Sequence, residues 1–181
     1  MSVRYCIKKG VAAIGSGGFG KVYIGTRCVD NRNYALKYVD ATGEEWQREY
    51  QILSAMKHDN VLRAVEMFEP NARRPTTGVI VTELYDMDLS SFLHRRSGVV
   101  AEKVAREISR EIATGVAYAH QKGIIYRDIK PQNVMVSLDV DKGVMRAVLA
   151  DFGLARWLPR KEEDEAAAAK DLLAALQDRA R

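Results

Sequence analysis

The hydrophobic period of the chain changes near residue 85, and this change constrains the fold more than any other feature. Before that point apolar and polar residues alternate, as at Val22, Ile24 and Thr26 and again over 34–39. Beyond it, apolar residues recur at three- or four-residue spacing on one face of 101–121, at Val104, Ile108, Ile112, Val116 and Ala119. Alternation predicts strands, and the longer spacing predicts an amphipathic helix. We therefore expect an α+β protein with a sheet-based first lobe and a helical second lobe.

The first lobe, residues 1–85, is predicted to hold five antiparallel strands and one helix. Residues 5–39 indicate strands on either side of a glycine-rich tip, with 11–15 leading into it. The helix is predicted over 43–57, where large apolar residues recur at helical spacing. Two further strands are expected at 61–68 and 78–85.

The second lobe, residues 86–158, is predicted to be mainly helical. A short helix over 89–96 precedes the long helix over 101–121, which Gly123 ends. A hairpin of 134–138 and 144–150 then leads to Asp151-Phe152-Gly153. Residues 159–181 form a third segment rich in alanine, leucine and charge, which predicts a terminal helix.

Composition limits the partners that the protein can have. The net charge of +4 comes from scattered basic residues, so no stripe for nucleic acid is visible. Cys6 and Cys28 show no metal-ligand or CxxC spacing, which favours two free thiols in a reducing compartment. The N-terminus lacks a signal-peptide core, and no apolar run reaches the ~18 residues of a membrane span. We expect a cytoplasmic or nuclear protein that binds neither membrane nor nucleic acid.

One short loop, residues 125–133, concentrates groups suited to chemistry. It holds a carboxylate, two cations and an amide, with Lys130 between Asp128 and Asn133. Such a set could bind a hydroxyl, a phosphate and a divalent metal together. A solvated polar turn after a helix is the alternative, and the loop alone does not decide between them.

A second motif, Gly15-x-Gly17-x-x-Gly20-x-Val22, precedes a predicted strand. Glycines let the backbone turn tightly and bring N–H groups close to phosphate oxygens. A dinucleotide-binding motif is the alternative, with Asp40 as its acid, but there the glycines would open a helix. Because alternation follows Gly20, a strand–loop–strand clamp on phosphates is favoured.

A third feature lies on the strand after the glycine loop. Ala35 and Lys37 share a strand face with Val39, and a small apolar residue beside a cation could hold an adenine ring and its phosphates. Glu49, on the predicted 43–57 helix, is the natural partner of Lys37. An ordinary strand lysine and a solvated helix acid are the alternatives.

Together these segments resemble the eukaryotic-type protein kinase family. The match comprises Gly-Ser-Gly-Gly-Phe-Gly-Lys-Val at 15–22, Ala-Leu-Lys at 35–37, Glu49, Tyr-Arg-Asp-Ile-Lys-Pro-Gln-Asn at 126–133 and Asp-Phe-Gly at 151–153. They occur in the family's order, and the resemblance covers about residues 5–158. It implies a two-lobe kinase-like fold, with ATP and Mg²⁺ as cofactors and a protein as substrate.

The resemblance also implies roles for individual residues. Asp128 would accept the proton of the attacking hydroxyl, and Lys130 would contact the γ-phosphate. Lys37, bonded to Glu49, would pair the α- and β-phosphates. Asn133 and Asp151 would hold Mg²⁺.

Further family positions would form the nucleotide pocket. Thr82 would stand at the back of the adenine site, the Glu83 carbonyl and Tyr85 amide would bond the adenine edge, and Asp88 would meet the ribose. Residues 83–89 are similar to the hinge of mitogen-activated and cyclin-dependent kinases, and Lys130-Pro131 resembles the serine/threonine branch. The full predicted set is Gly15, Ser16, Gly17, Gly18, Phe19, Gly20, Val22, Ala35, Lys37, Thr82, Glu83, Tyr85, Asp88 and Met135.

The sequence departs from the family pattern in three places. Tyr126 replaces the usual histidine. Residues 159–181 match none of the later family elements, so we expect an incomplete helical lobe whose uncovered 101–121 helix could take a partner protein. No Ser, Thr or Tyr follows Ser137, which predicts that Arg127 has no phosphate to bind, although the acids at 162–164 could stand in for one.

Two functions follow from this pattern. The first is an ATP-dependent serine/threonine kinase acting on protein hydroxyls. The alternative is an ATP-binding interaction module without catalysis, or an incomplete kinase fragment.

Overall fold

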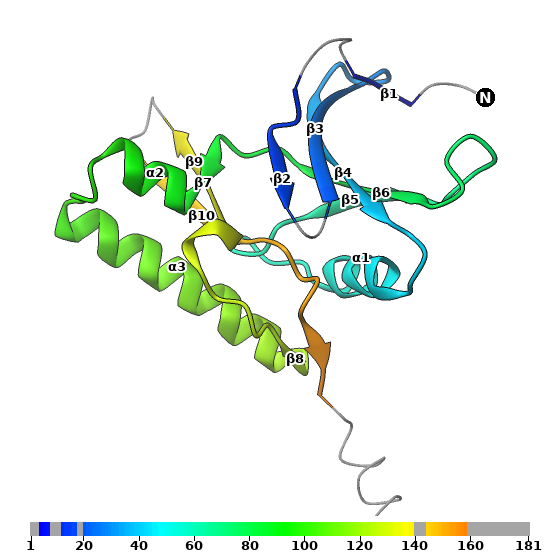
Figure 1. Cartoon of the computed structure of the whole chain (residues 1–181). Coiled ribbons are helices and arrows are strands. Elements are labelled where there is room, and N and C mark those ends of the chain that lie inside the picture. The colour runs from blue at the N-terminus through cyan, green and yellow to red at the C-terminus, as the bar shows by residue number, and fades with distance from the viewer. Residues whose placement is uncertain (1–3, 8–11, 18–19, 140–143, 159–181) are drawn as a thin grey trace, which may run out of the picture.

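A computed structural model describes residues 4–7, 12–17, 20–139 and 144–158 of the chain. Figure 1 shows a twisted sheet with helix α1 beneath it, and to the left of and below these a second part built around helices α2 and α3. The change of hydrophobic period near residue 85 therefore does mark the passage from a sheet-based part to a helical part. The kinase-like α+β fold expected from the sequence is confirmed.

The large sheet is antiparallel throughout. Its strands follow the order β1-β3-β4-β6-β5, and β2 pairs with β3 outside this path. The five-strand path agrees with the prediction, and β2 adds a short sixth strand. The bounds are β1 Tyr5–Cys6, β2 Gly15–Gly17, β3 Gly20–Arg27, β4 Asn33–Asp40, β5 Ala64–Phe68 and β6 Thr77–Glu83.

Helix α1, Glu45–Ala55, packs beneath this sheet and carries the predicted apolar face. Trp46 is only 4% exposed. A methyl group at Gly78 would lie 2.8 Å from its ring, so glycine is what lets β6 approach α1 closely. The strand predicted over 61–68 begins later, at Ala64, because Val61 makes a parallel bridge to Leu149 instead.

The second part opens with β7, Met87–Asp88, and α2, Leu89–Arg95. Asp88 caps α2, since its carboxylate accepts a hydrogen bond from the Ser91 backbone N–H at 2.8 Å. Helix α3 spans Glu102–Gln121, and Gly123 follows with φ +72°, a left-handed conformation that suits glycine at a helix end.

Short strands then carry the chain toward the cleft between the two parts. They are β8 Ile124–Ile125, β9 Val134–Asp139, β10 Val144–Leu149 and β11 Arg156–Trp157, with a 3₁₀ turn at Pro131–Asn133. The predicted hairpin is confirmed as β9 paired with β10, and β7 lies beside β9. The helix predicted for 159–181 lies outside the described residues.

One apolar core runs through both parts of the molecule. It joins Ile52 and Leu53 of α1 to Ile108 of α3 and to Phe152. The backbone reinforces this junction, because Leu62 N–H donates to Leu149 O at 2.8 Å. A methyl group on Gly115 would lie 2.5 Å from Asn60 O, so α3 also approaches this connection closely.

Part of α3 remains uncovered by the residues that the structure describes. Val104, Ile112 and Val116 are only half-buried. An open hollow of about 490 Å³ lies along this face beside Ile129, which is 60% exposed. The described residues thus leave part of the long helix uncovered, and the segment 159–181 lies outside them.

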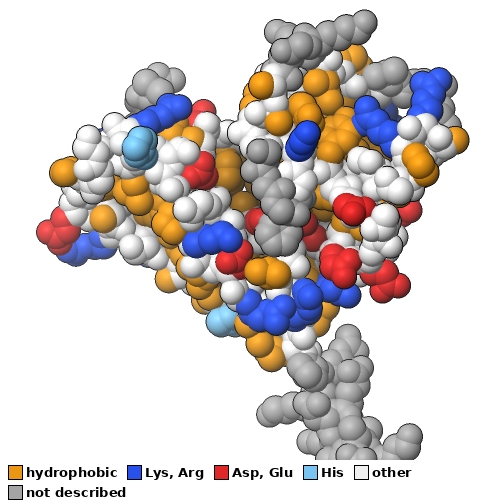
Figure 2. All heavy atoms as spheres, in the orientation of Figure 1, with side chains coloured by type: hydrophobic (Ala, Val, Ile, Leu, Met, Phe, Trp, Pro, Cys, Tyr) orange, Lys and Arg blue, Asp and Glu red, His pale blue; other side chains and the backbone are white. Residues whose placement is uncertain are grey.

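No helix among the described residues is long and apolar enough to cross a membrane. Figure 2 shows acidic and basic side chains interspersed on the face it presents, with hydrophobic side chains between them. Trp157 of β11 is 47% exposed, in contrast to Trp46.

Candidate active site

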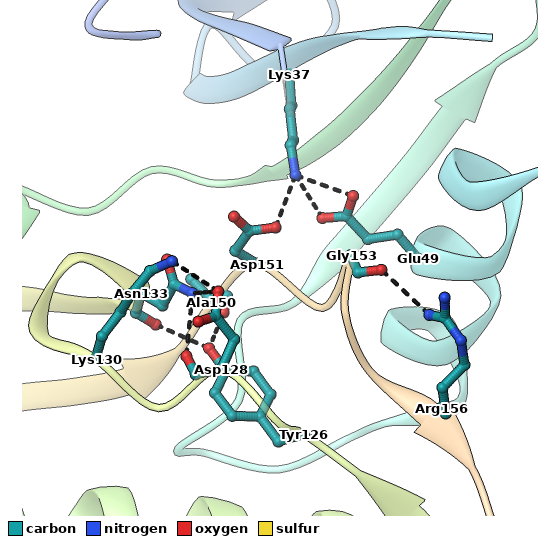
Figure 3. Close-up of polar contacts among 10 residues, drawn as sticks. All are labelled: Lys37, Glu49, Tyr126, Asp128, Lys130, Asn133, Ala150, Asp151, Gly153 and Arg156. Atoms are coloured by element: carbon teal, nitrogen blue, oxygen red, sulfur yellow. Dashed lines mark hydrogen bonds and ion pairs between the residues drawn. The ribbon is translucent and has the colours of Figure 1, made fainter. Parts of the chain in front are cut away.

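Lys37 extends from β4 toward two carboxylates, those of Glu49 and Asp151 (Figure 3). Its Nζ lies 2.7 and 2.9 Å from the two carboxylate oxygens of Glu49 and 3.1 Å from Asp151 Oδ1. The predicted pairing with Glu49 is confirmed. The contact with Asp151 was not predicted, and it links the sheet, α1 and the segment after β10 through one ammonium group.

This lysine cluster is shielded from solvent. The side chains of Lys37 and Glu49 are 17% and 6% exposed. Burial alone would lower the pKa of Lys37, but the two facing carboxylates outweigh it and raise that pKa above its ordinary value. Burial is also the largest influence on Glu49, where it raises the pKa against the attraction of Lys37. The ammonium is therefore charged throughout the neutral range.

A second cluster, the loop cluster, lies below the first and contains Asp128, Lys130 and Asn133. Asp128 Oδ2 accepts a hydrogen bond from Lys130 Nζ and another from Asn133 Nδ2, both at 2.7 Å. The hydrogen bond from Lys130 is the largest cause that holds the pKa of Asp128 below its usual value, and the bond from Asn133 adds to it. Among the described residues nothing donates to Asp128 Oδ1, so this oxygen can accept another proton donor.

Tyr126 joins the two clusters from below. Its buried hydroxyl donates to the backbone oxygen of Ala150, just before Asp151, and lies 3.3 Å from the backbone oxygen of Asn133. Its ring meets that of Phe152 edge-on, with centroids 4.8 Å apart. Tyr126 therefore ties the two segments that carry Asn133 and Asp151. The sequence showed only that it replaces a histidine.

Two site residues adopt the left-handed backbone conformation. Arg127 has φ +68° and Asp151 has φ +54°. Non-glycine residues in this region are uncommon, and at binding sites they mark backbone held by its surroundings. Here the Arg127 guanidinium donates to Leu154 O at 2.8 and 2.5 Å. Arg127 thus bonds a backbone oxygen of the segment after Asp-Phe-Gly. The acids at 162–164 lie outside the described residues.

Strand register fixes where several residues predicted for the adenine pocket lie. Val22 stands opposite Lys37, and Ala35 stands opposite Thr82, which is buried. Met135 lies opposite Asp88 in the β7–β9 pair. Val22, Ala35 and Thr82 thus lie on neighbouring strands of the large sheet, and Met135 lies in the smaller sheet of the second part. Gly18 and Phe19 lie outside the described residues.

Two predicted nucleotide-binding residues also serve the fold. The carboxylate of Asp88 accepts from both the backbone and the hydroxyl of Ser91, so a ribose would share it with the α2 cap. Gly20 has φ +118°, and a methyl group there would lie 2.0 Å from Tyr38 O. The packing of β3 against β4 therefore requires glycine at position 20, apart from any role of Gly20 in binding phosphate. The Asp88-x-x-Ser91 spacing was a local signal for the cap.

The residues predicted to hold Mg²⁺ offer suitable oxygens. The side-chain nitrogen of Asn133, Nδ2, donates to Asp128. The side-chain oxygen of Asn133, Oδ1, accepts no hydrogen bond from the described residues. Asp151 uses Oδ1 toward Lys37, and among the same residues its Oδ2 is likewise without a donor. Amide and carboxylate oxygens are ligands that Mg²⁺ prefers, so the pair fits the metal.

The two-lobed fold, with a lysine–glutamate pair under a glycine loop and an aspartate loop facing it, is the architecture of a protein kinase. Comparison with known families agrees. The family model described as "Protein kinase domain" matches residues 9–174. The chain belongs to this family.

Curated relatives are similar over most of the chain. "Serine/threonine-protein kinase fused" of Drosophila melanogaster is 35% identical over 159 residues, which is 84% of this chain and 18% of that protein. The "Probable cell division protein kinase" of Encephalitozoon cuniculi is 36% identical over 154 residues, 81% of this chain and 46% of its own length. A "Probable myosin light chain kinase" of Dictyostelium discoideum is 33% identical over 151 residues, 79% and 41% of the two chains. The chain thus spans less than half the length of these relatives.

Proposed function

We propose that this chain is an ATP-dependent serine/threonine protein kinase, which transfers the γ-phosphoryl group of ATP to a protein hydroxyl. The observation that carries the proposal is the pair of charged clusters facing one cleft. Lys37 is held by Glu49 and Asp151, and Asp128 is held by Lys130 and Asn133. The Drosophila relative, which is named as a serine/threonine-protein kinase, supports the same assignment.

Each cluster has a separate part in the proposed reaction. The ammonium of Lys37, fixed by Glu49, attracts the α- and β-phosphates and sets the position of the triphosphate. Mg²⁺, when bound to Asn133 and Asp151, would neutralise phosphate charge. Because positioning and charge neutralisation dominate phosphoryl transfer, preformed geometry in both clusters is the main contribution that the protein makes.

The transfer itself takes place at Asp128. The hydroxyl oxygen of the substrate forms a bond to the γ-phosphorus while the bond from that phosphorus to the β–γ bridging oxygen breaks, and ADP leaves. Asp128 Oδ1 orients the hydroxyl and receives its proton, and Oδ2 stays bonded to Lys130 and Asn133. Lys130 lies close enough to Asp128 to reach the transferred phosphoryl group as well.

The test is phosphate transfer from Mg-ATP to a generic basic protein substrate, with Asp128→Asn as the matched variant. Asparagine keeps the size and the hydrogen bond from Lys130 but cannot accept the proton. We expect kcat to fall by a factor on the order of 10²–10⁴. Equal turnover by both proteins would remove Asp128 from this role.

An ATP-binding module without catalysis is the second candidate, and the uncovered face of α3 near Ile129 favours it. The two candidates separate in one pair of measurements. A rise in melting temperature with Mg-ATP, without any phosphate transfer, supports the module. Transfer that depends on Asp128 supports the kinase.

A further inference from the structure

The two cysteines of the chain lie together at the edge of the large sheet, away from the cleft. Cys6 Sγ and Cys28 Sγ are 3.3 Å apart, and both residues are exposed. Cys6 is in β1 and Cys28 directly follows β3, 22 residues further along the chain. The sequence predicted two free thiols, which is confirmed, but gave no sign that they are neighbours.

Strand register explains the contact. In the β1–β3 pair, Cys6 stands opposite Thr26. The ladder continues one step further, because Cys28 N–H donates to Arg4 O at 3.0 Å. Cys28 is therefore two residues beyond Thr26 on the same face of the sheet, and diagonal neighbours of this kind lie within side-chain reach.

Side-chain contacts of β1 hold Cys6 in this register. The Tyr5 hydroxyl donates to Glu66 of β5, and the Tyr5 ring meets the rings of Tyr34 and Phe68 edge-on. Arg4 forms an ion pair with Glu66 at 3.1 Å. The contacts of Arg4 and Tyr5 therefore fix the position of β1, and this keeps the sulfur atoms of Cys6 and Cys28 in contact while both are reduced.

We infer that Cys6 and Cys28 form a reversible disulfide site, whose co-reactant is a small-molecule disulfide such as oxidised glutathione. One thiolate attacks a sulfur of the reagent, forms a mixed disulfide and releases one reduced thiol. The second cysteine then attacks the protein-bound sulfur, forms the Cys6–Cys28 bond and releases the second reduced thiol. The protein loses two electrons and two protons, which the two released thiols carry.

The bond would close a ring that contains the glycine loop. Residues 15–20 lie between Cys6 and Cys28 in the chain, so the ring links β1 covalently to the end of β3. Cross-linking a ring of about 20 residues restricts the unfolded chain. Oxidation is therefore expected to raise the melting temperature, by about 5 °C.

The test treats the full chain with oxidised glutathione, blocks remaining thiols by alkylation, and measures intact mass and linked peptides. We expect a monomer lacking two hydrogen atoms, with no remaining thiol and one peptide joining Cys6 to Cys28. Cys6→Ser and Cys28→Ser, each with one exposed thiol, should stop at a single glutathione adduct. Two adducts on the natural chain, or two unreacted thiols, would overturn the inference.

A melting measurement on the oxidised chain adds an independent check. A higher melting temperature that dithiothreitol reverses supports a bond that fits the folded sheet. Melting at or below the temperature of the reduced chain would show that the bond needs the β1–β3 pair to open, and would overturn the proposed geometry.

Discussion

The lysine cluster and the loop cluster face one cleft but differ in burial. Lys37 and Glu49 are 17% and 6% exposed, and their charges depend on each other because little water reaches them. Lys130 is 43% exposed, and water can replace its contact with Asp128. The lysine cluster is therefore part of the folded core, whereas the loop cluster is held by local hydrogen bonds on a loop.

This difference predicts different costs for the same kind of substitution. Removing one partner of a buried ion pair leaves a charge without compensation, and this is strongly destabilising. Exposed ion pairs contribute little to stability. Activity and stability should therefore separate between the two clusters.

The largest expected effect is that of Lys37→Met. It leaves the carboxylates of Glu49 and Asp151 facing each other without the ammonium between them. We expect the free energy of unfolding to fall by about 3 kcal/mol in urea titrations. Lys130→Met is the matched control, with an expected loss below about 1 kcal/mol.

Equal losses for these two variants would contradict the comparison, because burial would then not set the cost. Both variants should reduce phosphate transfer, so activity alone does not distinguish them. The two variants are distinguished by the urea concentration at which half of the protein is unfolded.

A smaller effect is expected for Tyr126→Phe, which tests the link between the clusters. The change removes the hydroxyl that bonds Ala150 O and lies near Asn133 O but keeps the ring against Phe152. We expect a loss of about 1–2 kcal/mol, since a buried carbonyl loses its partner. Tyr23→Phe is the control, because the structure gives the Tyr23 hydroxyl no hydrogen bond to the described residues. If Tyr126→Phe costs no more than the control, the two segments are held by packing alone.

The smallest expected effect concerns pH and the loop cluster. Lys130 holds the pKa of Asp128 below its ordinary value of ~3.9. A lowered carboxylate pKa contributes stability that is present above the unfolded-state pKa and is lost as pH falls through the folded-state pKa. Asp128 thus stays ionised from pH 5 to 8, and its protonation should not limit activity there.

Lys130→Met should move the titration of the Asp128 carboxyl to higher pH, as followed by carbon-13 NMR of labelled aspartate. The direction follows from removing the donor that favours the charged form. A titration that stays in place would show that Asn133 alone fixes the carboxylate.

Much of the fold follows from local patterns in the sequence. Alternation located β3 and β4, helical spacing located α1 and α3, and Gly123 ended α3 where φ is +72°. The Lys37–Glu49 pair could also be predicted from the sequence, because a strand lysine beneath a glycine loop needs a partner on the facing helix. These features depend on residues close in sequence or on one periodic face.

The remaining features depend on distant segments. Asp151 meets Lys37 across 114 residues, and this contact is set by how the end of β10 meets α1 and the sheet. The contacts of the Tyr126 hydroxyl with two backbone oxygens cannot be recognised from side-chain types in the sequence. The contact between Cys6 and Cys28 likewise depends on the register of a two-residue strand. Sequence spacing carries no information on any of these distances.

The two tryptophans differ in burial, so the protein contains two intrinsic fluorescence probes in different environments. Trp46 is enclosed between α1 and β6, whereas Trp157 is on β11 with nearly half of its surface in water. The indole in the apolar setting emits at shorter wavelength than the hydrated one, and an added quencher such as iodide reaches only the second. The fluorescence of the unmodified chain therefore contains two separable signals, one from the sheet-bearing lobe and one from the segment that follows Asp-Phe-Gly.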